Sequence, residues 1–211
     1  MKLKFDKNVK YCFFDYETEG LNLGTKKPVQ AAYYLYDGNG HKEEKTFFIN
    51  WELVDIPIKI DFGASKATGI YREQVIEEGI HPEDALELNN LYFNQGDYVA
   101  GHNILGYDFH IYSLFCKLLK RKPLELTHKC LDTLALAKGL NYEIHYKSGM
   151  NLFNYMLSLT NYWEKTKKKM NLSALAKDLD ITFDKERMHN ALYDIKINAK
   201  VWEKLKYQFD L

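Results

Sequence analysis

The sequence predicts an α/β fold in which a central mixed five-stranded sheet is flanked by helices on both faces. Segments with strand patterning fill the first third of the 211 residues, and strands alternate with helices in the remainder. A group of neighbouring strands followed by such alternation is typical of a mixed sheet beneath covering helices. The length suits one domain with a substantial core, so residues 1–211 are expected to form a single domain.

Three strands are expected first, at residues 11–17, 29–36 and 45–51. The first contains an apolar run that ends in charged residues. The second and third are separated by Asp37-Gly38-Asn39-Gly40, a composition typical of a tight hairpin turn. The first third of the chain is therefore interpreted as a meander.

Helices and two further strands alternate in the rest of the chain. Apolar residues at helical spacing, and Pro82 at the first turn of its segment, support the helix assignments. Short helical segments are expected within 65–76, helices at 82–93, 105–119, 132–138 and 190–207, a short helix from 171, and strands at 98–102 and 124–130. Residues 139–170 lack a clear period and are interpreted as an insertion with one helix at about 151–158, which could serve as a flap.

Composition excludes several classes of protein. The 29 basic and 29 acidic residues give a net charge of zero, which argues against binding long duplexes by overall charge. Cys12, Cys116 and Cys130 show no metal-binding spacing and are expected to be reduced, buried thiols. No secretory signal is visible, and no apolar stretch approaches the roughly 20 residues that span a bilayer. A cytoplasmic protein without a membrane partner is expected.

Two carboxylates mark the end of the first strand. Asp15 and Glu17 are two residues apart, so on a strand they project to the same side of the sheet. Like charges this close raise each other's pKa unless a cation lies between them. Hard divalent ions such as Mg²⁺ prefer carboxylate oxygens. The pair is thus a candidate metal site, and the alternative is an acidic turn after a strand.

Two later segments place acidic residues at helix starts. Asp108 follows the expected strand at 98–102 and would lie in the first turn of the next helix, where it could serve the helix alone. His189 and Asp194 precede and begin the last helix. They would converge only if His189 lies in the preceding loop, because an offset of five on one helix separates them by about 140°.

These three segments together resemble the exonuclease motifs of the DEDD superfamily. The motifs are Asp15-Tyr16-Glu17-Thr18, then His102-Asn103 with Asp108, then His189 with Asp194, whose H-x₄-D form resembles the DEDDh branch. Segments 67–70, 131–134 and 172–176 resemble supporting elements of the family, in the right order. Thr68 stands where the family often has histidine, a departure that leaves the four carboxylates unaffected.

The resemblance implies an RNase H-like fold and a metal-dependent 3′–5′ exonuclease that releases 5′-nucleotides. Two divalent cations, Mg²⁺ with Mn²⁺ able to substitute, would be held by Asp15, Glu17, Asp108 and Asp194. Asp15 would contact both ions, and His189 would take the proton from the attacking water, a role that suits a histidine at neutral pH.

The resemblance also implies how substrate would bind. Thr18 and Leu21 would lie beside the terminal nucleotide, and Asn103 would orient the segment that carries Asp108. Tyr107 and Phe109 could stack on a base or simply pack in the core. The expected partner is a nucleic acid 3′ end, most simply single-stranded DNA, with a separate polymerase as a second possible partner.

Two alternatives remain open at this point. One is an exoribonuclease of the RNase T or oligoribonuclease kind, since no motif reports on the 2′-hydroxyl. The other is a non-catalytic binding module, which would be expected to lack at least one of the carboxylates. A basic run at 165–169 beside Tyr162 and Trp163 could grip a single strand or could be a solvated surface.

Overall fold

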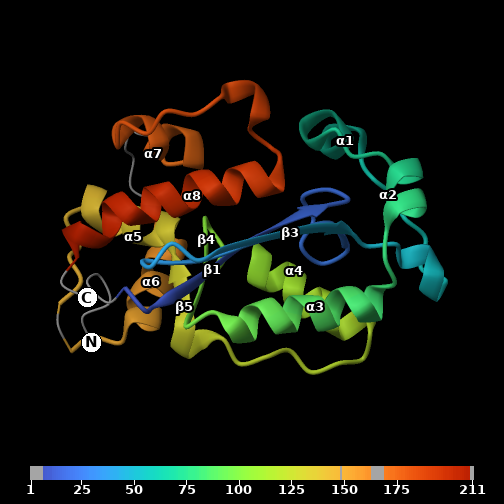
Figure 1. The fold of residues 1–211 in the computed structure, drawn as a ribbon, viewed down its shortest axis with the longest axis horizontal. Coiled ribbons are helices and arrows are strands. Elements are labelled where there is room, and N and C mark those ends of the chain that lie inside the picture. The colour runs from blue at the N-terminus through green and yellow to red at the C-terminus, as the bar shows by residue number, and fades with distance from the viewer. Residues whose placement is uncertain (1–6, 148, 163–168, 210–211) are drawn as a thin grey trace.

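A computed structural model describes residues 7–147, 149–162 and 169–209, and its centre is a mixed five-stranded sheet (Figure 1). The strands lie in the order β3-β2-β1-β4-β5. Their bounds are Lys10–Thr18 (β1), Pro28–Asp37 (β2), Lys42–Phe48 (β3), Tyr98–Gly101 (β4) and Cys130–Asp132 (β5). The first three are antiparallel neighbours, whereas β4 and β5 run parallel to β1. The expected meander and the mixed sheet are confirmed, and the fold is RNase H-like.

Helices cover both faces of this sheet (Figure 1). The last long helix, α8, packs across β1 and β2 on one face, and α3 and α4 pack on the opposite face. Near β5, α5 packs against α6 and α8, and α7 packs on α8. The helix bounds are Phe62–Thr68 (α1), Arg72–Glu78 (α2), Pro82–Gln95 (α3), Asp108–Leu118 (α4), Thr133–Asn141 (α5), Leu152–Thr160 (α6), Leu172–Asp178 (α7) and Ala191–Leu205 (α8).

Aromatic side chains fill the space between the sheet and its helices. Phe14 on β1 packs edge to face against Phe93 on α3, with ring centroids 4.7 Å apart. Trp51 and Phe115 form a similar pair at 5.2 Å, and Trp202 on α8 is fully buried. The three cysteines are buried and free, as expected. The core therefore holds the centre of β1 rigidly, and the strand carries its carboxylates from there to the sheet edge.

The bounds 124–130 expected for the fifth strand are wrong. The strand is limited to Cys130–Asp132, and a short 3₁₀ turn, Thr127–Lys129, precedes it. Glu125 accepts hydrogen bonds from the backbone N–H and the hydroxyl of Thr127, a local bond that competes with strand pairing. The apolar alternation at 124–126 thus belongs to a loop that buries only Leu126.

Two other boundaries shift, one because a side chain caps a short helix and the other because a glycine ends one. The strand expected at 45–51 spans Lys42–Phe48 instead, because Asn50 accepts from the Glu52 N–H and starts a 3₁₀ turn at Trp51. The region 65–76 divides into α1 and α2 at Gly69, which has a φ of 74° and ends α1. A left-handed φ of this kind favours glycine at a helix end. The single helix expected in the insertion is confirmed as α6.

Candidate active site

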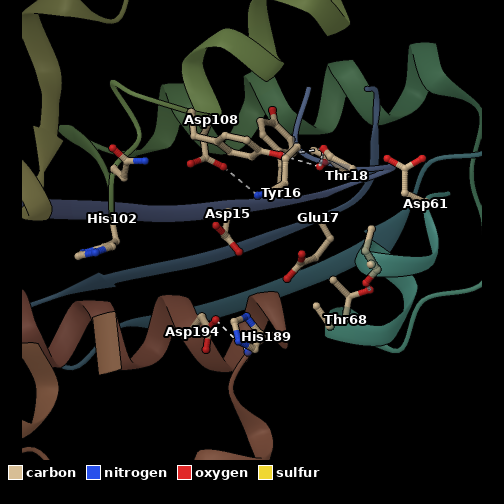
Figure 2. A pocket seen from close by; sticks show the side chains of 17 residues that line it. Asp15, Tyr16, Glu17, Thr18, Asp61, Thr68, His102, Asp108, His189 and Asp194 are labelled. Carbon is tan, nitrogen blue, oxygen red and sulfur yellow. Dashed lines mark hydrogen bonds between the residues drawn. The ribbon is translucent and has the colours of Figure 1, made fainter. Parts of the chain in front are cut away.

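An acidic pocket lies where β1 leaves the core. The cavity has a volume of about 660 Å³ and is bounded by the end of β1, α1, the β4–α4 loop and the start of α8. Figure 2 shows Asp15 and Glu17 pointing from β1 toward His189 and Asp194 at the start of α8. The pocket therefore brings together residues that are far apart in the sequence.

The alternation of β1 separates its buried side chains from its carboxylates. Phe14 and Tyr16 are buried, and the Tyr16 hydroxyl donates to Asn89 on α3. Asp15 and Glu17 point to the other face and are only partly buried. The pairing with β2 shifts register between Glu17 and Thr18, and such a bulge redirects the side chains that follow it. One strand thus supplies both core residues and pocket residues.

Asp108 begins α4 and is only 2% exposed. Its carboxylate accepts a hydrogen bond from the Tyr16 backbone N–H at 3.1 Å, which ties the start of α4 to β1. The loop before it is held by Asp132, whose carboxylate accepts from the N–H groups of Asn103 (3.1 Å) and Leu105 (3.0 Å). Asp132 therefore fixes the loop that presents Asp108.

His189 lies in the loop before α8, and Asp194 lies one turn into that helix. The backbone N–H of His189 donates to Asp194 Oδ2 at 3.1 Å, while Asn190 caps the helix by accepting from the Tyr193 N–H. His189 has a φ of 69° and an exposed side chain. This is the arrangement, a loop histidine and a helical aspartate, that allows the two side chains to face one pocket.

Burial raises the pKa of all four carboxyl groups, and neighbouring site carboxylates add to the rise for Asp15 and Glu17. Burial raises the pKa of Glu17 to about 8, and the charges of Asp194 and Asp108 add to the effect. Burial likewise raises the pKa of Asp108 to about 8 and that of Asp194 to about 6. The pKa of Asp15 is raised well above its usual value by burial and then by the other three carboxylates. The pocket thus holds more negative charge than its surroundings neutralise.

The donor set suits hard divalent cations such as Mg²⁺. All four groups offer oxygen ligands, no lysine or arginine is among the described residues that line the cavity, and the buried Asp194 Oδ1 has no hydrogen-bond partner in the described structure. Over residues 7–147, 149–162 and 169–209, no group of three or more His, Cys, Asp or Glu side chains is arranged so that it could hold a metal ion. Mutual repulsion keeps uncompensated carboxylates apart, so the charge of a cation would be needed to draw them together.

Polar residues shape the floor of the pocket beside the carboxylates. The Thr18 hydroxyl lies 2.7 Å from the Tyr107 hydroxyl and donates to the Gly20 carbonyl at 2.7 Å. Leu21 lines the pocket and is 88% exposed, and Asn103 lines it from the β4–α4 loop. These four predicted substrate-binding residues surround one cavity.

Phe109 is the one predicted site residue that does not line the pocket. Its ring stacks on Phe14, with centroids 6.0 Å apart and planes 17° apart. The side chain therefore packs against the core, which is the alternative that its sequence position left open. The basic run at 165–169 falls almost entirely outside the described residues.

Several pocket residues are not among the predicted site residues. Gly63, Ala64, Ala67 and Thr68 line the cavity from α1, and of these only Ala67 and Thr68 fall in a segment, 67–70, that resembles a family element. His102 lines it from the β4–α4 loop, and burial lowers the pKa of its imidazole to about 4, so it is neutral at physiological pH. The small side chains of α1 leave room for a ligand above the carboxylates.

A buried ion pair holds this wall in place. Glu19 is 1% exposed and accepts from Lys27 Nζ at 2.8 Å and from the Lys59 N–H at 2.6 Å. Its carbonyl accepts from the Asp61 N–H at 2.7 Å, immediately before α1. The pair therefore connects the end of β1 with the segment that leads into α1.

Replacing Glu19 with alanine is expected to lower the free energy of unfolding by about 3–5 kcal/mol, because Lys27 is left buried and unpaired. The double variant Glu19→Ala/Lys27→Met removes both charges and should lose less. Urea unfolding of the two variants measures the difference. A loss below about 1 kcal/mol in Glu19→Ala would contradict this role for the pair.

The fold and the pocket together define an RNase H-like domain with an acidic site at the end of its central strand. A family model for RNase_T, described as exonuclease, matches residues 12–202. The chain belongs to this exonuclease family. The membership agrees with the resemblance of its motifs to those of DEDD-type exonucleases.

The chain is similar to parts of larger proteins. It is 26% identical over 207 residues to a DNA polymerase III PolC-type of Mycoplasma pneumoniae and 27% identical over 199 residues to that of Mycoplasma genitalium. These matches cover 97% and 94% of this chain but only 12% and 11% of the relatives.

Solved structures of E. coli exonuclease I share the fold. One complex with an oligonucleotide superposes with a TM-score of 0.69 at 18% identity, and a zinc-bound complex with single-stranded DNA superposes with a TM-score of 0.72 at 18% identity. They cover 95% of this chain and 40% and 41% of the exonuclease I chains.

No helix within the described part of the chain is long and apolar enough to cross a membrane.

Proposed function

We propose that this chain is a metal-dependent 3′–5′ exonuclease that removes 5′-nucleotides from single-stranded DNA. The observation that carries the proposal is the pocket itself, because Asp15, Glu17, Asp108 and Asp194 all line it and no lysine or arginine is among its described lining residues. Membership of an exonuclease family supports hydrolysis of phosphodiester bonds as the reaction at this pocket. The preference for DNA is supported by the similarity to DNA polymerase III PolC-type and to exonuclease I bound to DNA oligonucleotides.

The four carboxylates would hold two divalent cations, and Asp15 is proposed as the ligand shared by both because it lies beside Glu17 on β1 and lines the same cavity as Asp108 and Asp194. When bound, such cations supply positive charge for the phosphate and make water a better nucleophile. The water oxygen would attack phosphorus and the P–O3′ bond would break in line with it. The released O3′ would take a proton from solvent to become the new 3′-hydroxyl, and the terminal 5′-nucleotide would be freed. Mg²⁺ is the expected ion, and Mn²⁺ is expected to substitute.

His189 would take the proton from the attacking water. Its exposed imidazole faces the pocket from a loop, and the loop is anchored by the bond from its own N–H to Asp194. Thr18 and Tyr107 would contact the terminal nucleotide, Leu21 would lie beside the last base, and Asn103 would orient the Asp108 loop. These side chains give the terminal nucleotide a defined position relative to the carboxylates.

The similarity to a DNA polymerase chain supports a second part of the proposal, that the exonuclease acts beside a separate polymerase. A polymerase from the same cell should then bind the chain and increase its removal of mispaired 3′ ends. A polymerase that changes neither the rate at which the chain removes mispaired 3′ ends nor its migration in a native gel would contradict this association.

A time course with 5′-labelled single-stranded DNA tests the activity. With Mg²⁺ we expect a ladder of labelled products that shortens one nucleotide at a time, and no products in EDTA. Immediate release of labelled mononucleotide would instead indicate cleavage from the 5′ end. No cleavage of single-stranded or duplex DNA or RNA would favour a non-catalytic binding module.

The same assay with RNA of matched sequence tests the choice of sugar. We expect slower hydrolysis of RNA, and faster hydrolysis of RNA would replace the DNA proposal with an exoribonuclease. Because the DNA and RNA oligonucleotides present the same phosphates, the difference in rate measures the effect of the 2′-hydroxyl on hydrolysis.

Replacing His189 with asparagine is expected to lower the rate of hydrolysis by about 10²–10⁴-fold, the usual contribution of a general base. Asparagine tolerates the left-handed φ at this position, so the loop should be retained. Added imidazole should restore part of the rate, which a purely structural role would not allow. The matched control is His41→Asn, an exposed histidine at the β2–β3 turn, and an equal loss in both variants would contradict the assignment.

A further inference from the structure

The active pocket cannot by itself attract a polyanion. Five acidic residues line it, namely Asp15, Glu17, Asp61, Asp108 and Asp194, and no lysine or arginine does so within the described residues. Phosphate groups are repelled by such a surface until cations are bound, and affinity for nucleic acid comes mainly from lysine and arginine contacts to phosphates. A nucleic-acid enzyme with this pocket needs basic contacts elsewhere.

A second and larger cavity supplies such contacts. It has a volume of about 1030 Å³ and lies between α8, strands β2 and β3, and the loop at 181–187; we call it the α8 groove. Its lining includes five basic side chains and two acidic ones. The basic residues are Lys42, Arg187, Lys196, Lys200 and Lys204, and the acidic residues are Glu44 and Glu203.

Three of these lysines form a row along α8. Lys196, Lys200 and Lys204 are each four residues apart, so they lie on one side of the helix at a spacing of about 6 Å along its axis. A regular row of cations on one wall suits the repeating phosphates of an extended strand better than it suits a single compact anion.

The acidic residues of the groove are already neutralised. Glu44 pairs with Lys196 at 2.6 Å, and Glu203 pairs with Lys206 at 2.6 Å. Lys200 and Lys204 are exposed, and no ion pair is found for either within the part of the chain that the structure describes. Their charge is therefore available to a ligand.

Aromatic rings accompany these cations. Tyr34 and Tyr193 line the groove partly exposed, and Tyr207 is 59% exposed. The Arg187 guanidinium lies 4.4 Å from the centre of the Tyr193 ring, a cation–π contact that presents a flat charged surface. Aromatic and guanidinium faces on which bases stack, combined with a positively charged groove, are the features that bind single strands without sequence preference.

The groove and the active pocket share a wall. Residues 187–194 contribute Arg187 and Tyr193 to the groove and His189 and Asp194 to the pocket. The Tyr193 hydroxyl accepts from the Asp184 N–H at 2.7 Å, which fastens the loop to α8 between the two cavities. A single-stranded nucleic acid whose 3′ end lies in the pocket can therefore continue over this wall into the groove.

We propose that the α8 groove is a second binding site for single-stranded nucleic acid, which holds the strand 5′ to the nucleotide being removed. The proposal rests on the proposed function, because it needs a strand whose 3′ end occupies the active pocket. The groove would supply affinity through Lys200, Lys204 and Arg187, and the pocket would supply the chemistry.

The double variant Lys200→Gln/Lys204→Gln tests the proposal, with Lys117→Gln/Lys122→Gln as the matched control. The control removes the same charge from exposed lysines at the end of α4 and just after it, and α4 lies on the opposite face of the sheet (Figure 1). Binding of a labelled 20-nucleotide thymidine strand is measured by fluorescence anisotropy in EDTA, where hydrolysis is absent and the pocket repels phosphate. Salt is varied in the same experiment.

The wild-type chain and the control are expected to bind in EDTA, with affinity that falls steeply with salt. The groove variant should bind roughly tenfold more weakly, and its plot of log affinity against log salt should be less steep by about 1.4, because two phosphate contacts are lost. With Mg²⁺, the variant should hydrolyse a tetranucleotide as fast as the wild type but need more of the 20-nucleotide strand to reach half-maximal rate.

Equal affinity and salt dependence in the groove variant and the wild type would overturn the proposal and leave the groove to another ligand, such as an acidic protein segment. Absence of wild-type binding in EDTA would overturn it as well. Failure of the proposed function is a separate result, because it is seen as the absence of hydrolysis with Mg²⁺ whatever the binding in EDTA.

Discussion

Asp15→Asn is expected to lower the rate of hydrolysis by at least about 10³-fold, since the substitution removes the carboxylate proposed as a ligand of both cations. Cation contacts contribute several kcal/mol to phosphoryl transfer, and about 4 kcal/mol corresponds to this factor. The side chain keeps its size, so the fold should be retained. Single-turnover rates with excess enzyme and Mg²⁺ measure the loss without a contribution from substrate affinity.

The same substitution should raise the stability of the metal-free protein, because it relieves repulsion with Asp108, Glu17 and Asp194. The matched control is Asp61→Asn, a carboxylate at the same pocket that is 53% exposed and paired with Lys26. Its rate should fall by less than about tenfold, as expected of an exposed pair. Hydrolysis that survives in Asp15→Asn, or falls equally in Asp61→Asn, would contradict the assigned site.

Stability without metal is expected to fall as the pH rises from about 4 to about 8. The pKa values of Glu17 and Asp108 are raised to about 8 and that of Asp194 to about 6, so the folded protein binds more protons than the unfolded chain in this window. The free energy of unfolding then decreases with pH at these sites, and the stabilisation is complete only below the unfolded pKa values. Thermal unfolding in EDTA across this range measures the effect.

Divalent cations should reverse this trend. At one hundred times the dissociation constant, a bound ion contributes about 2.7 kcal/mol, which for a chain of this size raises the melting temperature by roughly 5–10 °C. The rise should be larger at pH 8 than at pH 5.5, where protons compete for the same oxygens. Asp15→Asn should show a smaller rise at pH 8. An equal rise at both pH values, or in both proteins, would show that Mg²⁺ or Mn²⁺ binds elsewhere.

Local sequence patterns identify β1, β2 and the ends of the strands and helices that carry the carboxylates. Alternation predicts that Asp15 and Glu17 share a side of β1, and the structure places both at one pocket. The sequence also predicts the sign of the pKa shifts of Asp15 and Glu17 from like charges at close range, but burial, the largest cause of both, depends on the assembled pocket.

Other features depend on tertiary contacts that no local pattern contains. The α1 wall is placed through the buried Glu19, which pairs with Lys27 and accepts from the Lys59 N–H, and the Asp108 loop is held by Asp132, so both depend on contacts between separate segments of the chain. Phe109 turns to the core because Phe14 lies beside it. The shortening of β5 has a local cause instead, the bonds between Glu125 and Thr127, which strand patterning does not reveal. The α8 groove combines two strands, a helix and a loop, so its charge becomes visible only once they are assembled.

The most direct test of the account is a crystal structure of the chain with Mn²⁺ and thymidine 5′-monophosphate, the product of the proposed reaction. Anomalous diffraction locates Mn²⁺ independently of the protein atoms. We expect two peaks within the cavity bounded by Asp15, Glu17, Asp108 and Asp194, with Asp15 in contact with both and the nucleotide phosphate between the ions and His189. Peaks outside this cavity, or an empty cavity at saturating Mn²⁺ and nucleotide, would contradict the proposed site.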